Sequence, residues 1–233
     1  MNKESLVKEL SLRGISVSEL QVNQLVDLMD TTLLTNEKFN LTAIKDKEVF
    51  MEKMIFDSAL ALVNLDLSNK EVLDLGTGAG FPGLVMYILN PNIKLTLLDS
   101  TNKKIEYIKG FCSERGYKIN CVCDRAENFA RKNREKFDYV TARAVSELSI
   151  LMELSLPMLK VGGTLLALKS LGVEKEIDSA KNAFKKLDAH LEKVIEDNLP
   201  ESKEYRATVY IQKDKITNNK YPRDYAIIKD RKL

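Results

Sequence analysis

The chain has few of the residues that disulfide frameworks and metal sites require. Its 233 residues include one histidine, His190, and three cysteines, Cys112, Cys121 and Cys123. An odd number of cysteines argues against a disulfide framework and fits a reducing compartment, so we expect the protein to be cytoplasmic. Cys121 and Cys123 are two residues apart, but too few further ligands accompany them for a zinc site, and we expect no metal.

Long apolar runs are also missing. No run approaches the roughly 20 residues that a membrane helix needs, and the first ten residues, MNKESLVKEL, lack the apolar stretch of a signal peptide. With 44% hydrophobic and 30% charged residues and only five prolines, the composition is typical of a soluble globular protein. A chain of this length can bury one full core with a small appended element, but not two large domains.

The net charge is only +2, but it is unevenly distributed. Residues 1–69 carry seven basic and eleven acidic side chains, whereas residues 213–233 carry seven basic and three acidic ones. A basic tail can attract phosphates. The alternative is that this tail is an ordinary solvated chain end.

A glycine-rich turn is the most informative motif of the chain. Residues 72–83, VLDLGTGAGFPG, join a short apolar run, the end of a buried strand, to a segment with the pattern of a helix. Gly76, Gly78 and Gly80 let the backbone turn sharply and approach a ligand that a Cβ atom would exclude. The turn therefore predicts a binding site for a nucleotide-like cofactor.

The glycine spacing favours one such cofactor over another. The dinucleotide fingerprint places a glycine at the sixth position from Gly76, where this chain has Phe81. NAD is therefore disfavoured, whereas a GxGxG turn preceded by Asp74 suits a ligand with amine, carboxylate and sulfonium groups. S-adenosylmethionine is such a ligand.

An acidic residue follows the turn at the distance that a nucleoside site requires. Residues 93–98 have the pattern of the next strand, and Asp99 ends it 23 residues after Gly76. A carboxylate at this place can accept hydrogen bonds from both ribose hydroxyls. The alternative is that Asp99 only caps the helix that opens at Thr101 and that the glycines form an ordinary turn.

The first 69 residues have helical patterns only, and we predict a helical extension there that ends near residues 66–70. A serine at position 18 and a glutamine at position 21 form a capping box before the second helix. A third helix is expected at residues 46–65. The apolar faces of the three helices are predicted to contain Leu6, Val7 and Leu10, then Leu20, Leu25, Leu28 and Met29, then Phe50, Met54 and Leu60.

From residue 70 onward, apolar runs alternate with helical segments, which predicts a parallel sheet covered on both faces. Helices are expected at 81–89, 102–114, 147–159 and 173–188, and parallel strands at 72–75, 93–98, 119–123, 137–142 and 164–169. The last strands, 191–197 and 206–212, are joined too closely for a helical crossover and should be antiparallel. Residues 70–233 therefore predict an α/β, Rossmann-like, seven-stranded sheet of the class I S-adenosylmethionine-dependent methyltransferases, with a basic tail.

Several motifs identify a narrower family. They are FNLTAI at 39–44, FDSAL at 56–60, DLGTGAGFPGL at 74–84, LLDST at 97–101, RAEN at 125–128, ARAV at 142–145, LKVGG at 159–163 and YPR at 221–223. In these the chain resembles the bacterial methyltransferase family once called GidB and now RsmG, which makes 7-methylguanosine in 16S ribosomal RNA. The resemblance covers most of the chain.

The resemblance implies a set of cofactor contacts. Gly76 and Phe81 correspond to turn residues that touch the methionine and adenosine parts, and Arg143 to a residue near the methyl donor. With the turn itself, the implied cofactor-binding residues are Asp74, Gly76, Gly78, Gly80, Phe81, Asp99, Ser100, Thr101, Ala126, Glu127 and Arg143. Two alternatives stay open: residues 125–127 as an ordinary helix start, and Arg143 in an ion pair with Asp138 or Glu147.

The resemblance also implies 16S ribosomal RNA or the small ribosomal subunit as the partner of a monomeric enzyme. Arg143 and Lys169 are expected to position the substrate through guanine O6 or phosphate. The residues expected to contact RNA are Asn40, Thr42, Tyr221 and Arg223, with local turn formation as the alternative for the first two and tail packing for the others.

The chain departs from the family in two places. Many members have a histidine where this chain has Met54, and the tail after Arg223 lacks the Gly-Thr-Pro run that often follows. Guanine N7 is unprotonated at neutral pH, however, so its methylation needs no general base. We expect the rate to depend mainly on orientation of the two reactants, which in intramolecular reactions contributes up to roughly 7–11 kcal/mol.

Other functions remain open from the sequence alone. The closest is a methyltransferase that acts on a small molecule or a protein. A nicotinamide-dependent oxidoreductase on a similar fold is a second, and it would bind NAD tightly. A non-catalytic RNA-binding module is a third, although the residues of the glycine turn and Asp99 are all present.

Overall fold

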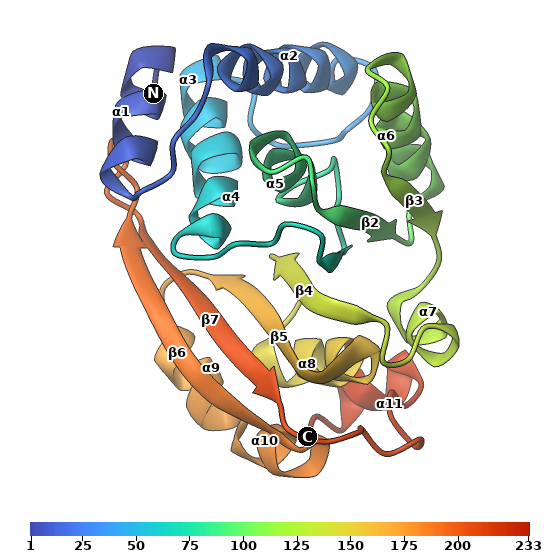
Figure 1. Cartoon of the computed structure of the whole chain (residues 1–233). Coiled ribbons are helices and arrows are strands. Elements are labelled where there is room, and N and C mark those ends of the chain that lie inside the picture. Colours follow the sequence, from blue (N-terminus) through green and yellow to red (C-terminus); the bar gives the residue numbers. More distant parts are fainter.

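A single seven-stranded sheet organises the computed structural model, which describes residues 1–233 (Figure 1). The strands lie in the order β3-β2-β1-β4-β5-β7-β6. Their bounds are β1 Glu71–Leu75, β2 Lys94–Asp99, β3 Asn120–Cys123, β4 Phe137–Arg143, β5 Leu159–Lys169, β6 Ala189–Asn198 and β7 Tyr205–Lys213. β1 to β5 pair in parallel, while β7 is antiparallel to both β5 and β6. The predicted fold class and the final antiparallel hairpin are therefore confirmed.

The helices between the strands differ from the prediction where local chemistry interrupts them. They are α5 Gly83–Leu89, α6 Asn102–Glu114, α7 Ala126–Lys132, α8 Leu148–Ser155, η3 Leu156–Met158, α9 Val173–Ser179, α10 Lys181–Leu187 and α11 Tyr225–Asp230. α8 ends before Pro157, which lacks the N–H that a longer helix needs. The predicted helix 173–188 is two helices because Ala180, with ψ near 3°, leaves the α-helical conformation.

Three helical segments precede the sheet. They are α1 Lys3–Leu12, α2 Glu19–Asn36 and a continuous third segment made of α3 Lys47–Phe50, the π-helix η1 Met51–Phe56, α4 Asp57–Ala59 and η2 Leu60–Leu62. The capping box is confirmed, because the Ser18 hydroxyl and the Gln21 side chain each accept the other residue's backbone N–H. Val7 and Leu20 were wrongly assigned to buried faces, since they are 37% and 68% exposed.

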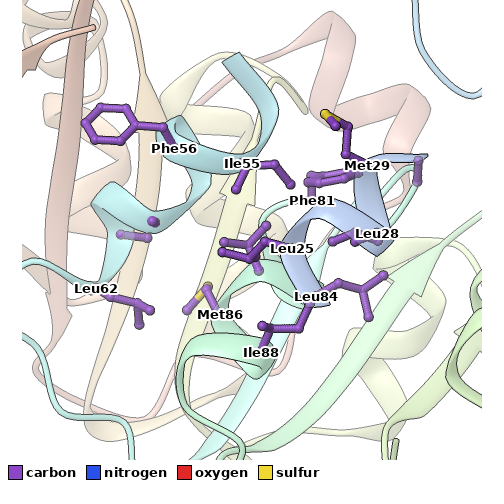
Figure 2. Close-up of a cluster of buried hydrophobic side chains, with 14 of the residues drawn as sticks. Leu25, Leu28, Met29, Ile55, Phe56, Leu62, Phe81, Leu84, Met86 and Ile88 are labelled. Carbon is purple, nitrogen blue, oxygen red and sulfur yellow. The ribbon is translucent and has the colours of Figure 1, made fainter. Parts of the chain in front are cut away.

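The hydrophobic core lies on the two faces of the sheet. Successive strand residues point to opposite sides, so Val72 belongs to one cluster and Leu73 to the other. Figure 2 shows part of the first cluster, where Leu25 and Leu28 of α2 pack against Leu84 and other residues of α5. The N-terminal helices are thus fixed on the helix that follows the glycine turn. None of the helices is long and apolar enough to cross a membrane.

Candidate active site

The carboxyl ends of the five parallel strands gather most of the predicted site residues at one edge of the sheet. Asp99, Arg143 and Lys169 are the last residues of β2, β4 and β5, and Gly76 directly follows β1. Parallel strands that begin together also end together, and ligands of open α/β sheets bind in the crevice beyond those ends. The sheet therefore brings together residues that lie far apart in the sequence.

Two neighbouring cavities lie at this edge. The smaller, of about 240 Å³, is lined by Leu75, Gly76, Leu98, Asp99, Ser100, Asp124, Arg125, Ala126, Glu127, Val145, Leu154 and Tyr225. The larger, of about 790 Å³, has Ile44, Lys53, Met54, Asp57, Arg143, Val145, Lys169, Glu176, Glu204 and Arg206 among its lining residues. Val145 lines both, so the cavities adjoin. Five predicted cofactor residues line the smaller cavity: Gly76, Asp99, Ser100, Ala126 and Glu127. Arg143, which was predicted to contact both cofactor and substrate, lines the larger cavity together with Lys169.

The glycine turn has the tight backbone that the motif predicted. Gly76 has a φ of +70°, and a Cβ atom there would lie 2.7 Å from Cγ2 of Val145, so only glycine fits. Gly78 has a φ of +60°, but a Cβ atom there would meet no atom within 4 Å. The backbone at Gly78 therefore borders open space, although Gly78 lines neither cavity.

Asp74 stabilises this turn from behind. Its Oδ2 accepts hydrogen bonds from the Thr77 hydroxyl at 2.6 Å and from the Gly83 N–H at 2.8 Å, whereas its buried Oδ1 has no partner. Asp74 is fully buried and lines neither cavity. Burial raises the pKa of the Asp74 carboxyl to about 6, although the two hydrogen bonds lower it.

The pKa of Asp74 predicts a pH dependence of stability. The folded protein takes up this proton near pH 6 and the unfolded chain near 3.8, so the stabilising contribution is present below about pH 4 and lost as the pH rises through 6. We expect Asp74→Asn, which keeps an oxygen acceptor, to remove this loss. As the pH rises from 4 to 7, the free energy of unfolding of Asp74→Asn should increase relative to that of wild type by up to about 3 kcal/mol. Urea unfolding across this range measures the difference, and a constant difference would contradict the assignment.

Asp99 both caps the loop before α6 and lines the smaller cavity. Its Oδ1 accepts the Thr101 N–H at 2.8 Å and its Oδ2 accepts the Gly78 N–H at 2.9 Å, so it does cap the loop before α6. It also lines the smaller cavity, with 8% of its surface exposed. Each carboxylate oxygen can accept a further hydrogen bond, so ribose hydroxyls can still bind there.

Other predicted cofactor residues are not all at the cavity surface. Ser100, Ala126 and Glu127 line the smaller cavity, and Glu127 Oε1 accepts a hydrogen bond from Arg125 Nε at 2.6 Å. Thr101 and Gly80 line neither cavity, and neither does Phe81, which is only 3% exposed. The Phe81 ring packs edge-on against Phe50, and the Arg143 guanidinium lies 5.9 Å from its centre. Phe81 therefore packs beside Arg143 instead of lining a cavity.

Arg143 is held by the third helical segment and not by Asp138 or Glu147, the two alternative partners. Its Nη1 donates to the Lys53 carbonyl at 3.1 Å and to Ser58 Oγ at 3.3 Å, and lies 3.7 Å from Asp57 Oδ2. Its Nη2 lies 3.3 Å from the Met54 sulfur. Burial lowers the pKa of the Arg143 guanidinium, and nearby carboxylates oppose this.

The two carboxylates that had been considered for Arg143 pair with lysines elsewhere. Asp138 accepts from Lys160 at 2.8 Å, and Glu147 accepts from Lys232 at 2.7 Å. An ion pair of Arg143 with either was therefore wrong. The partner that sequence reasoning missed is Asp57, which lies within the FDSAL motif.

Asp57 lies between two arginines. Its Oδ2 accepts a hydrogen bond from Arg206 Nε at 3.0 Å, in addition to facing Arg143. Burial raises the pKa of the Asp57 carboxyl, while the two guanidinium groups act in the opposite direction. Arg206 was not predicted, because β7 becomes a neighbour of β5 only through long-range strand pairing.

Lys169 has two partners within the larger cavity. Its Nζ donates to the Ser146 carbonyl at 2.7 Å and to Glu176 Oε2 at 2.6 Å. The same carboxylate oxygen accepts the Leu148 N–H at 2.9 Å. Glu176, which the sequence did not single out, therefore fixes Lys169 at the start of α8.

Asn40 and Thr42 lie in a loop at a third cavity, of about 980 Å³, beside the end of α2. The Asn36 side chain bonds to both backbone groups of Thr42, and the Thr42 hydroxyl accepts the Ile44 N–H at 3.1 Å. Thr42 thus forms a local turn, as its alternative supposed, whereas Asn40 is exposed. Ile44 lines the larger cavity, so this loop reaches the site.

The tail packs onto the protein instead of extending into solvent. Tyr221 is 4% exposed, and Arg223 donates two side-chain hydrogen bonds to the fully buried Glu153 at 2.8 and 2.6 Å. Lys213 is also buried and binds Glu135 and two carbonyl oxygens. These contacts correspond to the tail-packing alternative for Tyr221 and Arg223, and they neutralise part of the predicted basic charge.

The donor set of the smaller cavity fits S-adenosylmethionine. Asp99 offers acceptor oxygens for ribose hydroxyls, and Gly76 lines the cavity with a backbone that carries no Cβ atom. No group of three or more His, Cys, Asp or Glu side chains is placed to hold a metal ion.

Comparison with known proteins gives a family and a fold. The model of the GidB family, described as rRNA small subunit methyltransferase G, matches residues 21–204. A protein named ribosomal RNA small subunit methyltransferase G from Bacillus cytotoxicus is 40% identical over 227 residues, which cover 96% of this chain and 95% of that protein.

Solved structures that resemble this one are more distant in sequence. A putative methyltransferase from Bacillus halodurans has a TM-score of 0.52 and 19% identity, and the match covers 68% of this chain and 99% of that one. An S-adenosylmethionine-dependent methyltransferase from Aquifex aeolicus has a TM-score of 0.51 and 15% identity, covering 70% and 92%. At such identities these structures indicate the fold alone.

Proposed function

This chain belongs to the rRNA small subunit methyltransferase G family, and from that premise we propose that it methylates N7 of a guanine in 16S ribosomal RNA with S-adenosylmethionine. The observation that carries the proposal is the pair of adjoining cavities. Asp99 and Gly76 line one, Arg143 lines the other, and Val145 lines both. A cofactor and a base bound in these cavities are neighbours.

The reaction requires little acid–base chemistry from the protein. The cofactor supplies an electrophilic methyl group on a sulfonium, and guanine N7 has a free lone pair. The one histidine, His190, is bonded to Asp214, belongs to the edge strand β6 and lines neither cavity. Met54, which cannot transfer a proton, lines the larger cavity. The work of this chain is therefore to orient the two reactants and to exclude water.

Arg143 is suited to orient the guanine. Two oxygen acceptors, the Lys53 carbonyl and Ser58 Oγ, bind its Nη1, and Asp57 pairs with the same nitrogen. The remaining N–H groups meet at most a thioether, which is a weak acceptor. These donors can bind guanine O6. Asp57 balances the charge of Arg143, which helps because the purine gains positive charge as N7 is methylated.

Lysine and arginine side chains around the larger cavity can hold the phosphates of the target nucleotide. Lys169 is the strongest candidate, because Glu176 and the Ser146 carbonyl fix its ammonium group beside the cavity. The loop with Asn40 and Thr42 forms part of the approach to this cavity through Ile44. A target guanine turned out of its stack has room in about 790 Å³.

We propose that the enzyme acts as a monomer. The test of the function is to incubate the protein with labelled S-adenosylmethionine and either purified 16S rRNA or small subunits from cells that lack the gene. Label should enter the RNA and be blocked by S-adenosylhomocysteine. Label in ribosomal protein only, or no label in either RNA or protein, would contradict the proposal. The substrate that takes up more label per 16S rRNA molecule, purified RNA or small subunit, is the preferred one.

A further inference from the structure

The C-terminal helix contributes a residue to the smaller cavity. Figure 1 shows α11 beside α8 and close to α7, and Tyr225, its first residue, lines the cavity together with Asp99 and Ala126. Neither the glycine turn nor any motif of the family resemblance includes Tyr225. No function was assigned from the sequence to the residues after Arg223, because the chain departs from the family pattern there.

Contacts from several elements fix this helix in place. Asp224 accepts a hydrogen bond from Arg131 of α7 at 2.5 Å, and Ile228 is fully buried. Before the helix, Arg223 is bonded to Glu153 of α8, and after it Lys232 is bonded to Glu147 at 2.7 Å. The tail is therefore anchored on both sides of Tyr225, and these contacts fix the backbone of Tyr225 beside the smaller cavity.

The aromatic ring is also connected to the loop that follows β3. The Arg125 guanidinium lies 5.2 Å from the centre of the Tyr225 ring, within the range of a cation–π contact. Arg125 Nε in turn donates to Glu127 Oε1 at 2.6 Å. Tyr225, Arg125 and Glu127 all line the smaller cavity, so the tail and the β3–α7 loop form one continuous side of it.

We propose that Tyr225 is a further cofactor-binding residue, which contacts the adenine part of S-adenosylmethionine and is held in place by α11 and Arg125. The proposal rests on the proposed function, since it assigns the smaller cavity to the adenosine. Purine rings bind aromatic side chains through their faces, and removal of such a contact typically weakens binding by roughly 5- to 150-fold. The tail then contributes to cofactor binding through Tyr225.

The first test measures the binding of S-adenosylhomocysteine by calorimetry. Tyr225→Ala should weaken binding about tenfold, whereas Tyr225→Phe, which keeps the ring, should stay within about twofold of wild type. Ile227→Ala is the matched control, because Ile227 is on the same helix, is 46% exposed and lines neither cavity. Unchanged affinity in Tyr225→Ala, with wild type binding normally, would overturn this proposal alone.

A second test does not depend on loss of affinity. The chain has no tryptophan, so Tyr225→Trp places a single indole fluorophore at the cavity. The emission of this variant should change on addition of S-adenosylhomocysteine and saturate, whereas that of Ile227→Trp should not. An indole emission that does not respond, in a Tyr225→Trp variant that still binds by calorimetry, would overturn the proposal. Absence of binding to the wild-type protein would overturn the proposed function as well.

Discussion

Arg143→Ala is expected to lower the initial rate of 16S rRNA methylation by roughly 10- to 100-fold while the affinity for S-adenosylhomocysteine stays near that of wild type. The reason is that Arg143 lines the larger cavity and presents donors for guanine O6, and a contact of this kind typically contributes about 1–3 kcal/mol. Arg143→Lys should not restore the rate, because an ammonium cannot reproduce the guanidinium fork. Transfer of labelled methyl to small subunits measures both variants.

Loss of Arg143 leaves the fold intact for a structural reason. Asp57 keeps its hydrogen bond to Arg206, so the buried carboxylate is not left unpaired. We expect a stability loss of about 1–3 kcal/mol, which urea unfolding can check. Arg115→Ala is the matched control, because Arg115 also binds a carboxylate, Asp27, but lies away from both cavities. Wild-type turnover in Arg143→Ala would remove Arg143 from the site.

Asp99→Ala is expected to weaken cofactor binding by about 100-fold or more and to reduce methylation accordingly. Two hydrogen bonds from ribose hydroxyls to a carboxylate contribute about 1.5–3 kcal/mol each when the acceptor is charged. The same substitution also frees the N–H groups of Gly78 and Thr101. Asp99→Asn, which keeps one acceptor oxygen, should therefore have an intermediate affinity by calorimetry.

Asp138 gives a matched control for Asp99. Its carboxylate also accepts a backbone N–H, that of Glu71 at 2.8 Å, but it lies near the opposite end of its strand, as the second residue of β4. Asp138→Ala should lower stability without changing the affinity for S-adenosylhomocysteine. If Asp99→Ala binds the cofactor as well as Asp138→Ala does, Asp99 is only a cap of the loop before α6.

The cofactor side of the site could be predicted because its signals are local in the sequence. The glycine turn follows directly after β1, and Asp99 ends the next strand, so a short stretch of chain specifies both. The family resemblance then adds Arg143 and Lys169, which lie at the carboxyl ends of β4 and β5, where ligands of parallel sheets bind. Periodicity also predicted the seven strands and most of the helices between them, but it missed α7 and α11.

The residues that support the site could not be predicted, because long-range packing brings them together. Asp57 meets Arg206 only because the third helical segment lies against the start of β7, and no spacing in the sequence indicates this contact. The tail shows the same limit. Its charges left a phosphate-binding segment and a solvated chain end both open, whereas Glu153 and Glu135 bind two of these charges inside the protein.

The most direct measurement of the central claim is to locate the transferred methyl group. Small subunits from cells that lack the gene are methylated in vitro, and the 16S rRNA is then treated with borohydride and aniline, which cleave RNA at 7-methylguanosine. The account predicts one new cleavage, at a single guanine, that needs both the protein and S-adenosylmethionine and is greatly reduced with Arg143→Ala. Labelled RNA without this cleavage, or label confined to protein, would contradict methylation at guanine N7.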